Sequence, residues 1–395
     1  MKANRLRNLF LIILMVALAI AALGWAIHSV MQENTLGLDY YIFWHAGRAM
    51  FLEHQNPYTE SVTNEIQMGI YGRPALPDEN PMRFAYPPFG ISVILPFLFF
   101  SYDWSQAFWL ALNIILSVLL IFPIFKGQPK PGLFLFLSWY PLFFGLILGN
   151  LAILISAVII FSFAQLSKDK PTKSWLIIAG ILSSWAVCKP QVSGLLIGFL
   201  CLYAIKKQNW VYIKSFFVGL ALNVGLSFLA FPGWVTAWIS QLRDYSQYNQ
   251  VHSLIMDFLG LFGTAKILEP IGWLILGLGI FACLDLIWQW WHNRADAISV
   301  IVLLGLVSFC IPKQYIAYDQ ITLYIPVFLW LATKVNRKSA QIMVPIGVLC
   351  LTWLLFGLEK MGVDSAKNLI PAGLYLIWMI GVMLQDHKEK QELAK

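Results

Sequence analysis

Charged residues are scarce in this sequence. They make up 12% of the chain, while hydrophobic residues make up 59%. A soluble domain usually carries roughly 25% charged residues, and no polar stretch here is long enough to fold apart from its apolar neighbours. This composition excludes an ordinary soluble globular protein. We therefore predict an all-α polytopic membrane protein that forms a single transmembrane domain over residues 1–395.

Paired metal-ligand motifs are also missing. None of the five cysteines forms a Cys-x-x-Cys pair, so the sequence indicates neither a disulfide framework nor a thiolate metal site. Histidine ligands for a metal need partners at suitable spacing, and the histidines in the polar segments, His28, His45, His54 and His252, lack it. We predict no metal and no cofactor.

The net charge of +7 does not indicate nucleic-acid binding. The Lys and Arg residues lie in short loops between apolar runs, which is the positive-inside pattern of membrane proteins. This pattern places both termini in the cytoplasm, including a charged tail at residues 385–395. The apolar run Leu9–Ile27 is long enough to cross a bilayer, so we interpret it as a retained first helix and not a cleaved signal.

The apolar runs predict about 12 (11–13) transmembrane helices, with outer loops at about 28–104, 232–266 and 312–319. Residues 86–100 are apolar, but the segment is short and contains three prolines. It predicts interfacial or re-entrant helices within the first outer loop. Inner loops are short and basic, whereas the outer loops are longer and of mixed charge. We therefore expect the functional site on the outer face, with the protein in the cell membrane.

Asp39 is the candidate general base. It follows the first helix and is surrounded mostly by aromatic and apolar residues. Such surroundings desolvate a carboxylate, which raises its pKa and makes it a stronger base. On an interfacial helix, Trp44 and Arg48 would lie one turn apart. The alternative is that Asp39 only caps that helix.

Two cations are candidates for binding a phosphate. The guanidinium of Arg83 matches phosphate oxygens, although it could equally anchor the loop to lipid headgroups. Lys189 lies at a predicted outer turn, against the positive-inside pattern, so it should have a partner. A lipid-linked phosphate is one such partner, and snorkelling to headgroups is the alternative. The turn Gly149-Asn150 is expected beside Lys189.

The second and third outer loops mix aromatic residues with amides and charges, which suits sugar rings. An interfacial aromatic belt has the same composition. The candidate substrate-binding residues in these loops are Asn249, Gln250, His252, Lys313, Tyr318 and Asp319.

Several short motifs occur in a fixed order, and each is carried by a few residues. They are Asp39 to Ala49, Asn56-Pro57-Tyr58, Phe84-Ala85-Tyr86-Pro87-Pro88, Gly149-Asn150-Leu151, Lys189-Pro190, and Asn249 to Leu254. In this order they resemble the GT-C glycosyltransferases, and among these glycosyltransferase family 87, the polyprenyl-phosphate-mannose-dependent α-mannosyltransferases. The resemblance covers roughly residues 1–330.

The sequence departs from the family pattern at four places. Asn150 stands where glutamine is usual, and Pro190 follows Lys189 directly, where the family has a Lys-x-x-Pro element. Val251 and His252 interrupt the Asn-Gln-Ser-Leu loop. Residues 311–319 occupy the place of a Ser-Pro-x-x-Trp…His stretch but contain no histidine. These departures bear on the identity of the donor and on the role of the third outer loop.

The resemblance implies an inverting transferase without a metal. It would move a hexose such as mannose from a polyprenyl-phosphate donor to a glycan or glycolipid acceptor, with Asp39 as base. Arg83 and Lys189 would bind the donor phosphate, and Tyr86 and Asn150 would join the substrate-binding residues of the outer loops. The alternative function is a transporter or flippase of a lipid-linked substrate.

Overall fold

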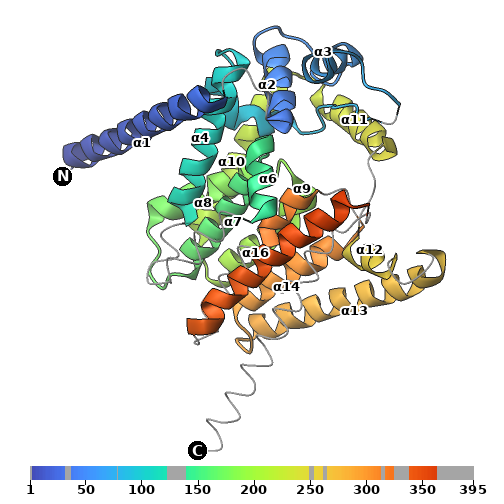
Figure 1. The fold of residues 1–395 in the computed structure, drawn as a ribbon. Helices are drawn as coiled ribbons and strands as arrows, with labels where there is room; N and C mark the ends of the chain where they lie inside the picture. The colour runs from blue at the N-terminus through green and yellow to red at the C-terminus, as the bar shows by residue number, and fades with distance from the viewer. Residues whose placement is uncertain are drawn as a thin grey trace, which may run out of the picture.

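The computed structural model describes residues 2–31, 37–77, 79–121, 139–248, 253–260, 265–312, 316–323 and 338–362. These residues form helices and connecting turns, with no β-strand among them (Figure 1). The all-helical class predicted from the sequence is confirmed. The first part of the chain contains α1 (Lys2–Met31), α2 (Leu38–Phe51), α3 (Glu60–Tyr71), the 3-10 helix η1 (Pro88–Phe97) and α4 (Tyr102–Ile121).

The central part contains α6 (Tyr140–Leu148), α7 (Ala152–Ser167), α8 (Lys173–Ala186), α9 (Pro190–Lys206), α10 (Trp210–Ala230), α11 (Trp234–Tyr248) and α12 (Leu254–Gly260). The last part contains α13 (Ala265–Trp291), α14 (Ala297–Cys310), η3 (Ala317–Gln320) and α16 (Lys338–Lys360).

Four described helices are long and apolar enough to cross a membrane: Leu14–Met31, Tyr102–Leu120, Trp210–Ala230 and Leu268–Trp291. A fifth is obtained if α6 and α7 count as one broken span. The predicted number of about twelve is not confirmed. Helices such as α9 and α14 have 17 and 14 residues, fewer than the roughly 20 residues that a straight span needs. Two apolar runs of the sequence that count toward the predicted twelve are 321–332, most of which lies outside the described residues, and 370–384, which lies wholly outside them.

Helix α7 forms the centre of the fold. Its side chains are buried along most of its length, and it packs against α4, α8 and α9. By contrast, α10 and α13 expose large apolar side chains such as Leu229, Leu278 and Phe281. In a chain with membrane-spanning helices, this contrast indicates a protein-enclosed core around α7 and lipid-facing surfaces on α10 and α13.

A sharp break separates α6 from α7. The two helix axes bend by 118° across Gly149, Asn150 and Leu151. Gly149 ends α6 with φ +69°, a left-handed conformation that side chains other than glycine rarely adopt. The chain therefore reverses at Asn150, and the side-chain amide of Asn150 lies at the start of the central helix α7.

The predicted first outer loop is largely helical. α2 and η1 lie within it, as the aromatic and proline-containing segments predicted, and α3 is a further helix; Figure 1 shows α2 and α3 together at one end of the molecule. Helix α2 packs closely on η1 at Gly47, where an added Cβ would lie 2.8 Å from Leu98. Pro88 is the first residue of η1, where no N–H is needed, and Pro96 lies inside it, where its missing N–H leaves one helical hydrogen bond unmade.

The two later predicted outer loops contain helical segments. The predicted loop at 232–266 contains α11 and α12. The predicted loop at 312–319 ends in η3, which is buried with Tyr318 and Asp319 inside the protein. Four residues are too few to show a helical period in the sequence, so only the packing of η3 against α6 and α7 reveals this arrangement.

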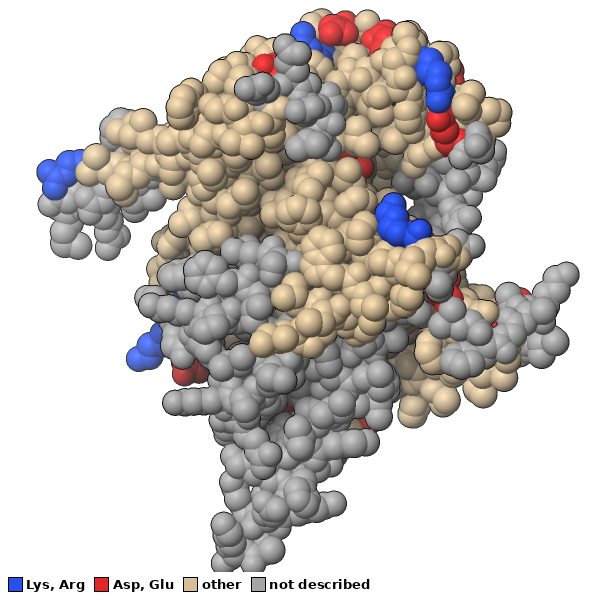
Figure 2. Space-filling view, in the orientation of Figure 1, with Lys and Arg blue, Asp and Glu red and all other residues tan. Residues whose placement is uncertain are grey.

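Charged side chains gather at the end formed by α2 and α3, and the described surface below them is mostly uncharged (Figure 2). At this end Arg73 pairs with Glu79, Arg83 with Glu60 and His45 with Glu65. Exposed lysines follow α7 and α9: Lys168, Lys170 and Lys173 after α7, and Lys207 after α9. Because α7 starts beside Asn150 and ends beside Lys168, these lysines lie at the opposite end of the central helix from Asn150.

Candidate active site

Asp39 lies in the first turn of α2, and that turn is held against α4. The Tyr102 hydroxyl donates a hydrogen bond of 2.7 Å to the Gly37 carbonyl just before α2. The Tyr40 ring stacks on Trp109 at 5.5 Å, and its hydroxyl bonds Ser105 at 2.7 Å. The start of α2 is thus fixed on both sides of Asp39, which directs this side chain toward the α6–α7 break.

The Asp39 carboxylate is in contact with residues from two other segments. Asn150 Nδ2 donates to Asp39 Oδ2 at 2.7 Å, and the Tyr318 hydroxyl is also hydrogen-bonded to Asp39. Asp39 is partly exposed, whereas Asn150 and Tyr318 are buried. Of these three residues, Asp39 is therefore the one that is not fully buried.

The side chain of Asn150 uses its full hydrogen-bonding capacity. Its Oδ1 accepts from Ala152 N at 2.9 Å and from Lys189 Nζ at 3.3 Å. Its amide is also hydrogen-bonded to the Tyr86 hydroxyl. Because two donors hold Oδ1, the NH₂ group must face Asp39. The amide orientation follows from these contacts.

Lys189 forms an ion pair with Asp319 behind Asn150. Each side chain is only 3% exposed, and the Lys189 ammonium also lies 4.9 Å from the centre of the Tyr318 ring. Lys189 is the residue before α9, whose helix starts at Pro190. Asp319 Oδ2 accepts from Ile316 N at 3.1 Å, which shapes η3. The predicted neighbour relation between Lys189 and the Gly149-Asn150 turn is confirmed.

Electrostatics make Asp39 a stronger base than an ordinary aspartate. Burial raises the pKa of the Asp39 carboxyl above its usual range, and the hydrogen bonds from Asn150 and Tyr318 partly offset this effect. The charge of Lys189 lowers the Asp39 pKa, and that of Asp319 raises it. Burial also raises the pKa of Tyr318, so its hydroxyl keeps its proton. Such a carboxylate suits proton abstraction.

Arg83 is not part of these contacts. Its guanidinium pairs with Glu60 Oε2 at 2.7 Å. Tyr86, three residues later, reaches the cluster through Asn150, and its ring packs 4.5 Å from that of Phe43. The structure thus brings together Asp39, Tyr86, Asn150, Lys189, Tyr318 and Asp319.

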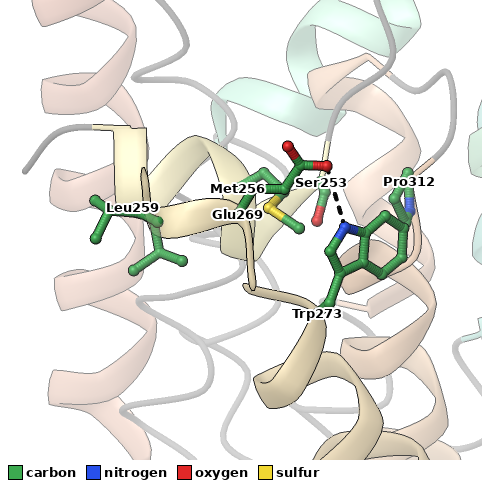
Figure 3. A pocket seen from close by; sticks show the side chains of 7 residues that line it. Ser253, Met256, Leu259, Glu269, Trp273 and Pro312 are labelled. Atoms are coloured by element: carbon green, nitrogen blue, oxygen red, sulfur yellow. Dashed lines mark hydrogen bonds between the residues drawn. The ribbon is translucent and has the colours of Figure 1, made fainter. Parts of the chain in front are cut away.

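The remaining predicted site residues, Asn249, Gln250, His252 and Lys313, lie outside the described residues. Their sequence neighbours line a cavity of about 280 Å³. Ser253 and Pro312 form one part of it, and Figure 3 shows Trp273 and Glu269 side by side at its wall. Trp273 Nε1 donates to Glu269 Oε1 at 3.2 Å. The cavity combines an aromatic face, a carboxylate and apolar side chains.

Sequence reasoning missed the residues of α4 that support the α6–α7 break. Trp109 Nε1 donates to the Gly149 carbonyl at 2.8 Å, and Asn113 Nδ2 donates to the Asn150 carbonyl at 3.3 Å. These donors lie one turn apart and satisfy carbonyls that the helix end leaves open. A signal was present, because a buried amide in an apolar span is costly and usually has a partner.

Within the part of the chain that the structure describes, no group of three or more His, Cys, Asp or Glu side chains could hold a metal ion. The candidate site consists of one partly exposed carboxylate, hydroxyl and amide donors, and a buried ion pair. These groups can move a proton and orient a hydroxyl.

Comparison with known proteins identifies the family. The model of glycosyltransferase family 87 matches residues 84–312, more than half of the chain. The match includes Tyr86, Asn150 and Lys189 and starts after Asp39. No curated protein and no solved structure matches the chain. The helical membrane fold is consistent with this match, and the chain belongs to glycosyltransferase family 87.

Proposed function

We propose that this glycosyltransferase moves a hexose such as mannose from a polyprenyl-phosphate donor to a hydroxyl of a glycan or glycolipid acceptor. The observation that carries the proposal is the partly exposed Asp39 held by Asn150 and Tyr318. No metal is part of the proposed mechanism, since the donor leaving group is a phosphate monoester of a lipid.

In the proposed reaction, Asp39 takes the proton of the acceptor hydroxyl. The acceptor oxygen forms a bond to the anomeric carbon while the bond from that carbon to the phosphate oxygen breaks, and polyprenyl phosphate leaves. Attack from the face opposite the leaving group inverts the anomeric configuration. A positioned base contributes about 10²–10⁴-fold to such a rate.

Purified protein with a synthetic polyprenyl-phosphate sugar tests the proposal. We expect release of polyprenyl phosphate together with a glycosylated acceptor. Movement of the intact lipid between leaflets without release of polyprenyl phosphate would instead identify a flippase.

The site is proposed to lie on the outer face of the cell membrane, with both termini in the cytoplasm. The lysines after α7 and α9 support this orientation, because basic loops stay inside and the Asp39 cluster lies at the other end of α7. The predicted total of about twelve spans remains part of this proposal. Accessibility labelling of single cysteines at Lys170 and Glu60 tests the two sides, with label from outside expected only at Glu60.

Arg83 is proposed to contact the donor phosphate. Its partner Glu60 has 62% of its side chain exposed, and an exposed ion pair contributes only about 0–1 kcal/mol, so a phosphate can displace Glu60 cheaply. The same role for Lys189 requires the buried pair with Asp319 to open. Breaking a buried pair by removing one partner costs about 3–5 kcal/mol, so Arg83 is the easier contact.

We expect Arg83→Gln to raise KM for the donor about tenfold, the loss of one charge-assisted contact, with a small change in kcat. The matched control is Arg73→Gln, which removes an exposed pair with Glu79 and should leave KM unchanged. Steady-state kinetics with the donor varied measure both. An unchanged donor KM in Arg83→Gln would remove Arg83 from donor binding.

The cavity beside Trp273 is proposed to hold an acceptor sugar. Its volume of about 280 Å³ is too small for a whole lipid-linked sugar, since pockets for drug-sized ligands span roughly 300–1,000 Å³. A ring such as Trp273 can stack on a sugar, and Glu269 can accept hydrogen bonds from its hydroxyls.

We expect Trp273→Ala to raise KM for the acceptor by about fivefold, because a stacked aromatic contact contributes on the order of 1 kcal/mol. The donor KM should stay unchanged. Trp288→Ala, another exposed tryptophan of α13, is the control for a lipid-facing role. Equal effects of the two substitutions on the acceptor KM would argue against this cavity.

A further inference from the structure

An enclosed ion pair lies directly behind the Asp39 carboxylate. Lys189 and Asp319 are each only 3% exposed, whereas Asp39 is partly exposed. A substrate that approaches Asp39 from outside therefore meets Asp39 before it meets the pair. The sequence assigned both residues to substrate binding, but their burial favours a different role.

Two short connections join the pair to Asp39. Lys189 Nζ donates to Asn150 Oδ1, and Asn150 Nδ2 donates to Asp39. On the other side, Asp319 neighbours Tyr318 in η3, and Tyr318 bonds Asp39. Asp319 also shapes η3 by accepting from Ile316 N. Each donor to Asp39 is thus oriented by one member of the ion pair.

We infer that Lys189 and Asp319 are positioning residues that set the orientation and basicity of Asp39, and that they act on its basicity in opposite directions. The inference rests on the proposed function, in which Asp39 is the base. A positive charge near Asp39 stabilises its ionised form, and a second carboxylate destabilises it. Removing either partner of one ion pair should therefore move the Asp39 pKa in opposite directions.

The other charged side chains near Asp39 are paired elsewhere. On α2 and its neighbours, charged side chains have separate partners: His45 with Glu65, Arg48 with the Leu98 carbonyl, and Asp103 with His28. Among the residues that the structure describes, the ionisable groups that share an interaction with Asp39 are Lys189, Asp319, Tyr86, Tyr102 and Tyr318. Burial raises the pKa of Tyr86 and of Tyr318, so these hydroxyls stay neutral, and Lys189 and Asp319 supply the nearby charges.

The Asp39 pKa can be measured without any activity assay. Because burial raises it in the folded protein, ionised Asp39 costs stability as pH rises from about 4. The melting temperature of Asp39→Asn minus that of the parent should therefore increase with pH and level off above the folded pKa. This difference is measured in three backgrounds: wild type, Asp319→Asn and Lys189→Met.

We expect the folded pKa of Asp39 to fall by about one unit in Asp319→Asn and to rise by about one unit in Lys189→Met. The acid limb of kcat/KM should move in the same directions wherever transfer is measurable. Asp103→Asn, whose partner is His28, is the control and should move neither. Shifts in the same direction, or no shift in either background, would overturn the inference.

Lys189→Met leaves Asp319 unpaired in a buried place, which can prevent folding. The double variant Lys189→Met/Asp319→Asn removes both charges and keeps the shapes. It should fold, with an Asp39 pKa between those expected for the two single variants, and a double variant outside that interval contradicts the inference. If the Asp39 pKa shifts in opposite directions in the two single variants but the wild-type protein transfers no sugar, the inference holds and the proposed function is wrong. If the wild-type protein transfers sugar but the Asp39 pKa does not shift in this way, the proposed function holds and the inference is wrong.

Discussion

Asp39→Asn is expected to lower kcat for sugar transfer by about 10²–10⁴-fold, the usual contribution of a positioned base. The asparagine is nearly isosteric, and its side chain can still accept from Asn150 and meet the Tyr318 hydroxyl. Binding of the donor should therefore change little. Single-turnover transfer and donor binding, measured on the same detergent-purified protein, separate the two effects.

The same substitution should also alter stability, with a predictable sign. Asp39 has a raised pKa in the folded protein, so its contribution to stability is present below the unfolded pKa of about 3.9 and is lost as pH rises through the folded value. Asp39→Asn should thus melt higher than wild type at pH 7 and close to it at pH 4. A variant that is more stable at neutral pH yet inactive cannot have lost activity by unfolding.

A matched control is Asp103→Asn, since Asp103 lies at the start of α4 and pairs with His28 outside the cluster. It should retain transfer. Full activity in Asp39→Asn would remove Asp39 from the mechanism, whatever its contacts in the fold.

Gly149→Ala is expected to have the second large effect. Gly149 has φ +69°, a conformation that costs a residue other than glycine about 1–2 kcal/mol. An added Cβ would also lie 2.7 Å from the Tyr40 Cβ, and overpacking costs typically 1–3 kcal/mol. Together these predict a loss of about 2–5 kcal/mol and displacement of Asn150 from Asp39, with transfer falling at least tenfold. Thermal unfolding and transfer assays measure both.

Two other glycines separate the causes of this loss. Gly72 also has a positive φ, +68°, but an added Cβ there meets nothing within 4 Å, so Gly72→Ala should show only the conformational cost. Gly198 lies in helix α9 with open space around it, and Gly198→Ala should be neutral or stabilising by about 0.5–1 kcal/mol. If Gly149→Ala matches Gly72→Ala in stability and keeps its activity, the close contact with Tyr40 does not position the site.

The chemistry of the site followed from residue type and local surroundings. Asp39 was predicted as a desolvated carboxylate because its neighbours are aromatic, and its raised pKa agrees with this. Lys189 was expected to have a partner because it departs from the positive-inside pattern. Arg83 was grouped with Lys189 on charge alone, and the structure pairs it with Glu60 on α3. The sequence shows the charge of a residue and its local surroundings, but it does not show which distant residue will be its partner in the fold.

By itself, the sequence determined that this protein is helical and crosses a membrane, since a scarcity of charge and runs of apolar residues set both without any long-range contact. Motifs in a fixed order also determined the family. Only the tertiary structure decided that Asp319 pairs with Lys189, 130 positions away, and that Asn150 links this pair to Asp39. Such contacts depend on how the α6–α7 break, the start of α9 and η3 pack together, and no local pattern in the chain encodes that packing.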